Sequence, residues 1–302
     1  MNDCAIRVSG LHKTYGKVTA VDHLSFQVNR GEIFGLLGPN GAGKTTTIRM
    51  LIDIIKPDAG DVRVLNQSPA EVRARVGYLP EERGLYRGLR VGETLTYLGR
   101  LKGMTKSSAQ KRAQELLDRV ELGEWRKHKV QELSRGMQQK VQLIASIIHD
   151  PELVILDEPF QGLDPVNVGM VKDLIRDLRA QGKTIVLSAH EMSQVEVLCE
   201  RIALIDHGRA VLYGALDELK KQFSPNALEI SPQVDLTGWS QVLRVVPCDH
   251  RQMVYLKPGV TPHDFLKSIL DAGLPIEQFQ VATMSLEQIF VAVVKGDGNG
   301  RT

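Results

Sequence analysis

One glycine-rich segment, residues 38–45, has the residue types and spacing most able to do chemistry. It fits the phosphate-loop pattern G-x-x-x-x-G-K-[ST] at every fixed position. Its glycines let the backbone curl so that successive N–H groups point at one anion. Lys44 offers a cation for β- and γ-phosphates, and Thr45 offers a hydroxyl for Mg²⁺. We expect a nucleotide to contact Gly38, Pro39, Asn40, Gly41, Ala42, Gly43, Lys44, Thr45 and Thr46.

Two adjacent carboxylates, Asp157 and Glu158, follow the apolar run 153–156. Strand tips are where doubly wound folds place their ligands. We expect Asp157 to hold Mg²⁺ through its water shell and Glu158 to polarise the attacking water. An acidic surface turn after a core strand is the alternative, and the phosphate loop upstream weighs against it.

Ser134 and Gly136 open a segment whose apolar side includes Val141 and Ile144. Serine is a favoured helix N-cap, and a capped helix N-terminus can bind phosphate. An ordinary cap would explain this pattern equally well, but its position upstream of Asp157 favours a role at the nucleotide.

These side chains need a scaffold of strands and helices. Residues 33–37 are predicted to form a buried strand before the phosphate loop, and Ile48, Leu51, Ile52 and Ile55 recur at helical spacing after it. The apolar runs 153–156 and 184–188 are typical of buried parallel strands. Between them, Asp164 and Pro165 suit an N-cap and first helical position. Strands alternating with helices predict an α/β fold with a mostly parallel core sheet.

The remaining segments suggest two domains. Residues 4–30 alternate polar and apolar as in an antiparallel β layer, and residues from about 81 to 150 form a helical insert. We expect a nucleotide-binding domain over 1–215, a small α+β accessory domain over 216–296 and a polar tail over 297–302. Strands are predicted over 227–231, 242–246 and 253–257, and helices over 263–272 and 285–295.

Composition limits the partners. A net charge of +2 over 302 residues gives no electrostatic case for nucleic acid as a main partner. The three cysteines form no CxxC pair, which suits a reducing compartment. The sequence contains no apolar run long enough to span a bilayer and no signal-peptide pattern at its start. Any work at a membrane is therefore expected to need another chain that spans it.

Taken together, these motifs resemble the nucleotide-binding subunit of ATP-binding cassette (ABC) transporters, with a P-loop NTPase fold, over about residues 4–215. By this resemblance, Tyr15 is expected to stack on adenine, and His190 is expected to sense the γ-phosphate. Ser134 and Gly136 would belong to the signature motif, which reaches the γ-phosphate held by the other subunit. Asp164 would lie in the loop that crosses the dimer interface. Glu158, His190 and Lys44 are the expected catalytic residues. The resemblance implies ATP and Mg²⁺ as ligands and a second ATP-binding subunit, most simply a second copy. It also implies a separate polytopic membrane permease, with the chain peripheral on the cytoplasmic side of the membrane.

The sequence departs from the family pattern in two places. In the signature motif, Arg135 stands where glycine is usual and Met137 where glutamine is usual. The residue after Pro80 is Glu81, where the family has a glutamine that contacts Mg²⁺ and senses the membrane partner. A carboxylate can still accept from a metal-bound water, so Glu81 is kept with Thr45 and Asp157 as a predicted metal-site residue. Its charge beside a triphosphate carries an electrostatic cost.

Residues 80–86 and 285–290 resemble a bacterial subgroup of ABC exporter ATPases, which drive drug, antibiotic, sodium or polysaccharide efflux through a separate permease. Two other functions stay open. A soluble ABC-type clamp on nucleic acid or ribosomes is disfavoured by the single cassette and the lack of heptads or basic excess. A small-molecule kinase would have no use for Ser134, Gly136 or Asp164.

Overall fold

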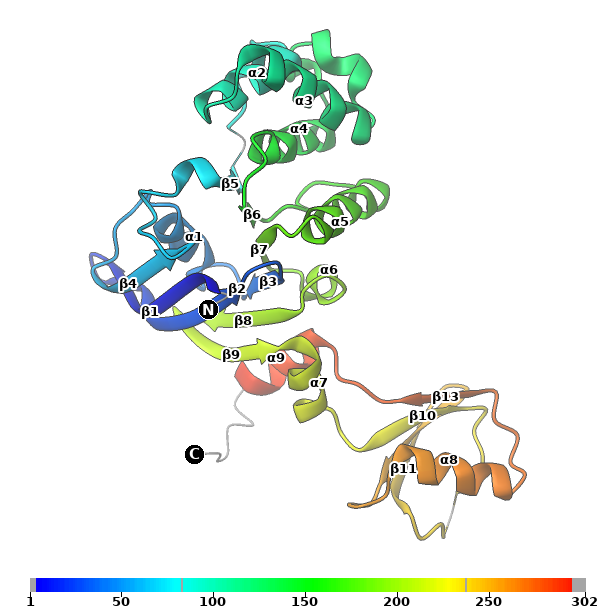
Figure 1. Cartoon of the computed structure of the whole chain (residues 1–302). Coiled ribbons are helices and arrows are strands. Elements are labelled where there is room, and N and C mark those ends of the chain that lie inside the picture. The colour runs from blue at the N-terminus through cyan, green and yellow to red at the C-terminus, as the bar shows by residue number, and fades with distance from the viewer. Residues whose placement is uncertain (1–3, 83, 237, 295–302) are drawn as a thin grey trace. The chain divides into compact units, whose positions relative to one another are not determined.

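The phosphate loop and the Asp157–Glu158 pair lie at the ends of strands in a six-stranded sheet of order β5-β6-β7-β3-β8-β9. The computed structural model describes residues 4–82, 84–236 and 238–294 (Figure 1). It divides into a first unit, Met1–Leu216, and a second unit, Asp217–Thr302. The polar tail predicted over 297–302 lies outside the described residues.

The first unit contains two sheets. In the larger one, β3 and β5–β8 run parallel, and β9 closes the edge antiparallel to β8. The smaller one is antiparallel, of order β2-β1-β4. The strands are β1 (Cys4–Tyr15), β2 (Val18–Asn29), β3 (Ile33–Leu37), β4 (Ala59–Val64), β5 (Val76–Leu79), β6 (Leu153–Asp157), β7 (Thr184–Ala189), β8 (Arg201–Asp206) and β9 (Arg209–Ala215).

Helices surround the larger sheet, and three of them, α2, α3 and α4, form a cluster beyond the end of β5 (Figure 1). The helices of the first unit are α1 (Lys44–Leu51), α2 (Val91–Leu101), α3 (Lys106–Arg119), α4 (Arg135–Ile147), α5 (Pro165–Ala180) and α6 (Met192–Glu196). The 3₁₀ turns are η1 (Arg73–Arg75), η2 (Gly123–Lys127) and η3 (Val130–Glu132). The predicted α/β class is confirmed, and β3, β6 and β7 are buried along their whole length, as apolar parallel strands should be.

One helix is shorter than the apolar spacing predicted. The helix after the phosphate loop ends at Leu51, so Ile52 and Ile55 lie beyond it. Asp53 adopts a left-handed φ of 61°, which interrupts the helix. Both isoleucines still pack against the core shared by the two sheets. The apolar spacing therefore predicted correctly that they face the core, but it placed the end of the helix too late.

The second unit is a four-stranded antiparallel sheet of order β11-β12-β10-β13 with helix α8. Its core joins β10 and β12 to α8 through Leu228, Val254 and Phe265. The sequence did not predict β13 or α7. The elements are α7 (Leu216–Phe223), β10 (Ala227–Ser231), β11 (Val242–Cys248), β12 (Arg251–Leu256), α8 (Pro262–Asp271), β13 (Gln278–Val281) and α9 (Leu286–Val294).

Candidate functional site

The phosphate loop runs from the end of β3 to the start of α1. Gly38 and Gly43 have φ values of 146° and 105°, which side chains rarely tolerate. A Cβ on Gly38 would lie 2.1 Å from the Ile205 carbonyl oxygen, and one on Gly43 would lie 2.3 Å from that of Ala20. Only glycine fits at either position, so the loop can bring its N–H groups close to an anion.

A pocket of about 250 Å³ opens over this loop. The pocket brings together residues that are far apart in the sequence: Glu81 and Glu158 line it together with the phosphate loop. Its lining consists of Ala20, Asn40, Gly41, Gly43, Lys44, Thr45, Thr46, Glu81 and Glu158. The Lys44 Nζ donates to the carbonyl oxygens of Gly38 (2.7 Å) and Pro39 (3.1 Å), which keeps the ammonium over the loop.

A buried serine bonds both acidic residues at the tip of β6, through the side chain of Asp157 and the backbone of Glu158. Ser188 on β7 pairs with Asp157 in the parallel ladder, and its hydroxyl donates to Asp157 Oδ1 at 2.5 Å. The same Oγ accepts the backbone N–H of Glu158 at 3.1 Å. Glu158 has a left-handed φ of 52°, a strained conformation of the kind that recurs at functional sites. The residues around Ser188 in the sequence do not indicate this role, because it depends on the register between β6 and β7.

The charged groups of the pocket shift one another's pKa values. Burial raises the pKa of Asp157, and the Ser188 and Thr45 hydroxyls and Lys44 oppose that rise. Burial also raises the pKa of Glu158, opposed by its hydrogen bond to His190. Burial lowers the pKa of the Lys44 ammonium, while the nearby carboxylates raise it. Each buried charge is therefore tolerated because of the others.

His190 follows β7 and meets Glu158 directly. Its Nδ1 lies 2.9 Å from Glu158 Oε2. The histidine side chain is 41% exposed and that of Glu158 is 10% exposed. The pair therefore combines a nearly buried carboxylate with a ring that reaches the surface, which suits an acid–base group in contact with a bound ligand.

The oxygen atoms near Lys44 fit a magnesium ion. Asp157 Oδ2 is buried and has no hydrogen-bond partner among the described residues. An orphaned carboxylate oxygen in the interior is costly, and a hard divalent cation would satisfy it. Carboxylate and hydroxyl oxygens are the ligands Mg²⁺ prefers, so Asp157, Thr45 and Glu81 form a suitable donor set.

Nine predicted site residues are not in the lining of this pocket. Five of them belong to the phosphate loop or adjoin Glu158, namely Gly38, Pro39, Ala42, Asp157 and His190. The other four are Tyr15, Ser134, Gly136 and Asp164. Tyr15 ends β1 with 49% of its surface exposed. Ser134 caps α4 by accepting the Met137 N–H, and Asp164 caps α5. Gly136 and the 162–164 loop are neighbours, since a Cβ on Gly136 would lie 3.5 Å from the Leu163 side chain.

Two buried glutamines of α4 connect that helix to the pocket. Gln142 donates to the carbonyl oxygens of Pro80 (3.1 Å) and Glu82 (3.0 Å), on either side of Glu81. Gln139 donates to the Pro159 carbonyl, directly after Glu158. The helix capped by Ser134 thus holds the loops of two pocket residues, a role that its sequence does not reveal.

Comparison with known proteins decides the family. Residues 21–161 match the ABC transporter family model. An uncharacterized ABC transporter ATP-binding protein of Alkalihalophilus pseudofirmus is 48% identical over 86% of this chain and 98% of its own length. The chain belongs to the ATP-binding proteins of ABC transporters. It is an ABC ATPase by family, and none of its described helices has the length and apolar character needed to cross a membrane.

The relatives of this ABC ATPase include export and resistance proteins. Residues 214–294 match the C-terminal domain of ATP-binding proteins like DrrA1-3. The daunorubicin/doxorubicin resistance ATP-binding protein DrrA of Streptomyces peucetius is 33% identical over 99% of this chain and 94% of its own length. Among solved structures, a dimeric ATP-binding cassette, MJ0796, bound to ADP and Pi has a TM-score of 0.64 and 25% identity, covering 70% of this chain and 98% of that one.

Proposed function

We propose that this chain is the ATP-hydrolysing subunit of an ABC exporter and that it drives a separate membrane permease through ATP-dependent dimerisation. The observation that carries the proposal is the Glu158 carboxylate, which faces Lys44 and the phosphate loop across one pocket. The relative DrrA supports export, since it is a daunorubicin/doxorubicin resistance protein. The identity of the exported compound is a property of the permease.

The chemistry follows from the positions of these side chains. Glu158 accepts a proton from the water that attacks the γ-phosphorus, and the bond from that phosphorus to the β–γ bridging oxygen breaks. His190, bonded to Glu158, orients its carboxylate. Lys44 and the loop N–H groups stabilise the charge on the leaving phosphate oxygens. Mg²⁺, held by Thr45 and Asp157 with Glu81 beside it, would supply further charge neutralisation.

Dimerisation gives a role to the residues that lie outside the pocket. Ser134 and Gly136 stand at the N-terminus of α4, where free N–H groups and the helix dipole favour an anion. In a head-to-tail dimer they would meet the γ-phosphate held by the partner subunit, and Asp164 would lie at the same interface. The dimeric cassette bound to ADP and Pi supports dimerisation.

A permease-binding surface is proposed beside the loop of Glu81. A groove of about 390 Å³ is lined by Ile54, Tyr78 and Lys102, among others. Ile54 is 59% exposed and Leu101, next to Lys102, is 64% exposed. Exposed apolar side chains around a groove are typical of a protein contact. Because Tyr78 lies three residues before Glu81, a permease segment seated here would act on the nucleotide pocket. It would also hold the chain at the cytoplasmic face of the membrane.

The test is capture of a trapped complex. Glu158→Gln removes the proton acceptor but keeps the shape of the side chain, so it should trap an ATP-bound dimer. The variant is isolated from native membranes in mild detergent with MgATP, and the co-purifying chains are identified by mass. A polytopic membrane protein at about one-to-one ratio supports the proposal.

The matched control is the double variant with Lys44→Ala, which should lose ATP-dependent capture because it binds the triphosphate weakly. Recovery of ribosomes or soluble proteins alone would favour the clamp function instead. A Glu158→Gln protein that hydrolyses ATP at the wild-type rate would show that another group is the base.

A further inference from the structure

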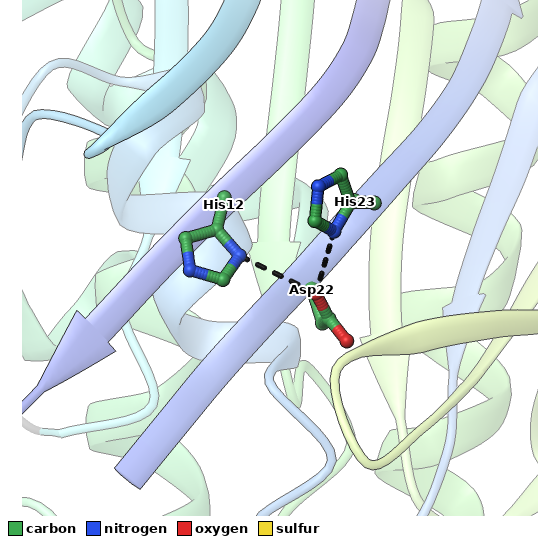
Figure 2. A group of neighbouring side chains, drawn as sticks. All are labelled: His12, Asp22 and His23. Atoms are coloured by element: carbon green, nitrogen blue, oxygen red, sulfur yellow. Dashed lines mark hydrogen bonds and ion pairs between the residues drawn. The ribbon is translucent and has the colours of Figure 1, made fainter. Parts of the chain in front are cut away.

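A second group of potential metal ligands lies on the β1–β2 hairpin, outside the phosphate pocket. It consists of His12 on β1 with Asp22 and His23 on β2, here called the His–Asp–His group (Figure 2). In a regular strand, Asp22 and His23 would point to opposite faces of the sheet. The ladder pairs Leu11 with Leu24 and Lys13 with Val21, so two residues of β2 oppose His12 alone. This β-bulge, with His23 at a φ of 50°, turns both neighbours toward His12.

The spacing of the group suits one small cation. One ligand atom from each of the three side chains lies within 4.8 Å of the others. Asp22 Oδ1 lies 3.4 Å from His12 Nδ1 and 2.6 Å from His23 Nδ1 (Figure 2). Zinc–ligand bonds of about 2.0–2.2 Å place tetrahedral ligand atoms roughly 3.3–3.5 Å apart. The His12–Asp22 distance already fits, and His23, whose side chain is 79% exposed, is free to adjust.

One ring nitrogen of the group has no hydrogen bond within the part of the chain that the structure describes. His12 Nδ1 is shielded from solvent and forms no hydrogen bond among the described residues, although it points at the Asp22 carboxylate. A nitrogen that is shielded from solvent and has no hydrogen bond is costly. A metal ion bridging it to Asp22 Oδ1 would remove that cost.

The two carboxylate oxygens of Asp22 have different neighbours, and this arrangement leaves one of them available to a metal ion. The Arg209 Nε donates to Oδ2 at 2.7 Å, which leaves Oδ1 facing the two histidines. Outer-sphere hydrogen bonds of this kind orient ligating carboxylates. The backbone of Asp22 is fixed as well, because its N–H donates to the Gly208 carbonyl oxygen at 2.9 Å.

We propose that His12, Asp22 and His23 bind a divalent transition-metal ion of the Zn²⁺ type through two imidazole nitrogens and one carboxylate oxygen, with solvent in the fourth position. This ligand set suits Zn²⁺ and Co²⁺ better than Mg²⁺ or Ca²⁺, which prefer oxygen. The site adjoins the support of the phosphate loop. Gly208, which accepts from Asp22, donates its own N–H to the Ala42 carbonyl oxygen at 2.9 Å. Binding should therefore stabilise the hairpin and the loop together.

The test uses the nucleotide-free full-length protein and Zn²⁺ alone, because ATP itself chelates zinc. Calorimetric titration should give one site of micromolar or tighter affinity. His12→Ala and His23→Ala should each weaken it at least about tenfold, since even the loss of an outer-sphere partner has an effect of that size. His23 is largely exposed, so its removal leaves the core intact. The matched control is His207→Ala, which removes an exposed histidine beside Asp206 on the neighbouring β8–β9 hairpin.

Nitrogen NMR of histidine-labelled wild-type protein identifies the bound rings without any substitution. The ring nitrogens of His12 and His23 should shift on addition of Zn²⁺. The absence of saturable binding below about 100 µM, weaker than ordinary protein zinc sites, would overturn the proposal. It would equally be overturned if zinc binds as well to His12→Ala and His23→Ala as to wild type and is lost in Glu158→Gln, because that result would place the ion at His190 and Glu158.

Discussion

Ser188→Ala tests whether one hydroxyl holds the Asp157 carboxylate and the backbone of Glu158 in place. The substitution removes the hydrogen bond to Asp157 Oδ1 and leaves the Glu158 N–H without its acceptor. Ser188 is fully buried, so water has little access to replace the lost partner. A hydrogen bond to a charged group contributes about 1.5–3 kcal/mol, and an unpaired buried N–H costs about 1–3 kcal/mol. We expect a loss of about 3 kcal/mol in total, reduced to the extent that Asp157 becomes protonated.

For a unit of this size, each kcal/mol lowers the melting temperature by about 2–4 °C. Ser188→Ala should therefore lower the melting temperature of the first unit by roughly 6–12 °C in scanning calorimetry. The pKa of Asp157 should rise further, because the hydrogen bond from Ser188 opposes the effect of burial more than that from Thr45 does. ATP turnover should then need several-fold more Mg²⁺ for half-maximal rate.

A second buried serine provides the control. The Ser146 hydroxyl donates to the Leu143 carbonyl oxygen within α4, so its acceptor is uncharged. Ser146→Ala should cost no more than about 1 kcal/mol. If Ser188→Ala lowers the melting temperature no more than Ser146→Ala and leaves the Mg²⁺ requirement unchanged, Ser188 does not position the carboxylates.

Two other predictions concern groups near the pocket and in the helical insert. Glu81→Gln keeps an acceptor oxygen and removes a charge that faces Lys44, so basal ATP turnover should persist while its stimulation by permease-containing membranes changes; complete loss of turnover would indicate a direct catalytic role. Burial beside Lys102 lowers the pKa of His149 to about 4, against about 6.5 in unfolded chains. The unfolded state therefore binds more protons between these values, and the stabilising contribution is complete above about pH 6.5 and lost as the pH falls toward 4. Between pH 7 and pH 5, the free energy of unfolding of His149→Gln should fall by about 1 kcal/mol less than that of wild type, after allowance for solvent screening. Urea unfolding at the two pH values measures this difference. Equal decreases in the two proteins would refute the assignment to His149.

Local patterns were sufficient to predict the scaffold. The strand over 33–37 and the capped helix at Asp164 were predicted within a residue or two, because burial, glycine and capping signals lie within a few positions of each element. The helix after Lys44 was predicted too long, because apolar spacing reports burial and does not reveal the left-handed turn at Asp53. In the second unit β13 was missed, since only four residues form it and its partner β10 lies far away in the sequence.

The hydrogen-bond partners of Ser188 and the neighbours of His12 could not be predicted, because they depend on register. Ser188 reaches Asp157 only because β6 and β7 pair in one particular alignment. His12 meets Asp22 and His23 only because a bulge gives β2 one extra residue. Neither a strand register nor a bulge has a signal in the sequence around a single residue.

The hydrogen bonds of α4 suggest how contact at one end of that helix can influence hydrolysis at the pocket. Its N-terminus carries Ser134 and Gly136, and further along, Gln139 and Gln142 bond the loops that carry Glu158 and Glu81. Both glutamines are buried, so these bonds are sheltered from exchange with solvent. A helix moves as a rigid element. If the N-terminus shifts when it meets a γ-phosphate from the partner subunit, both loops must follow or lose buried hydrogen bonds, which is unfavourable. The same helix can therefore link the proposed dimer contact, the catalytic carboxylate and the loop beside the proposed permease groove.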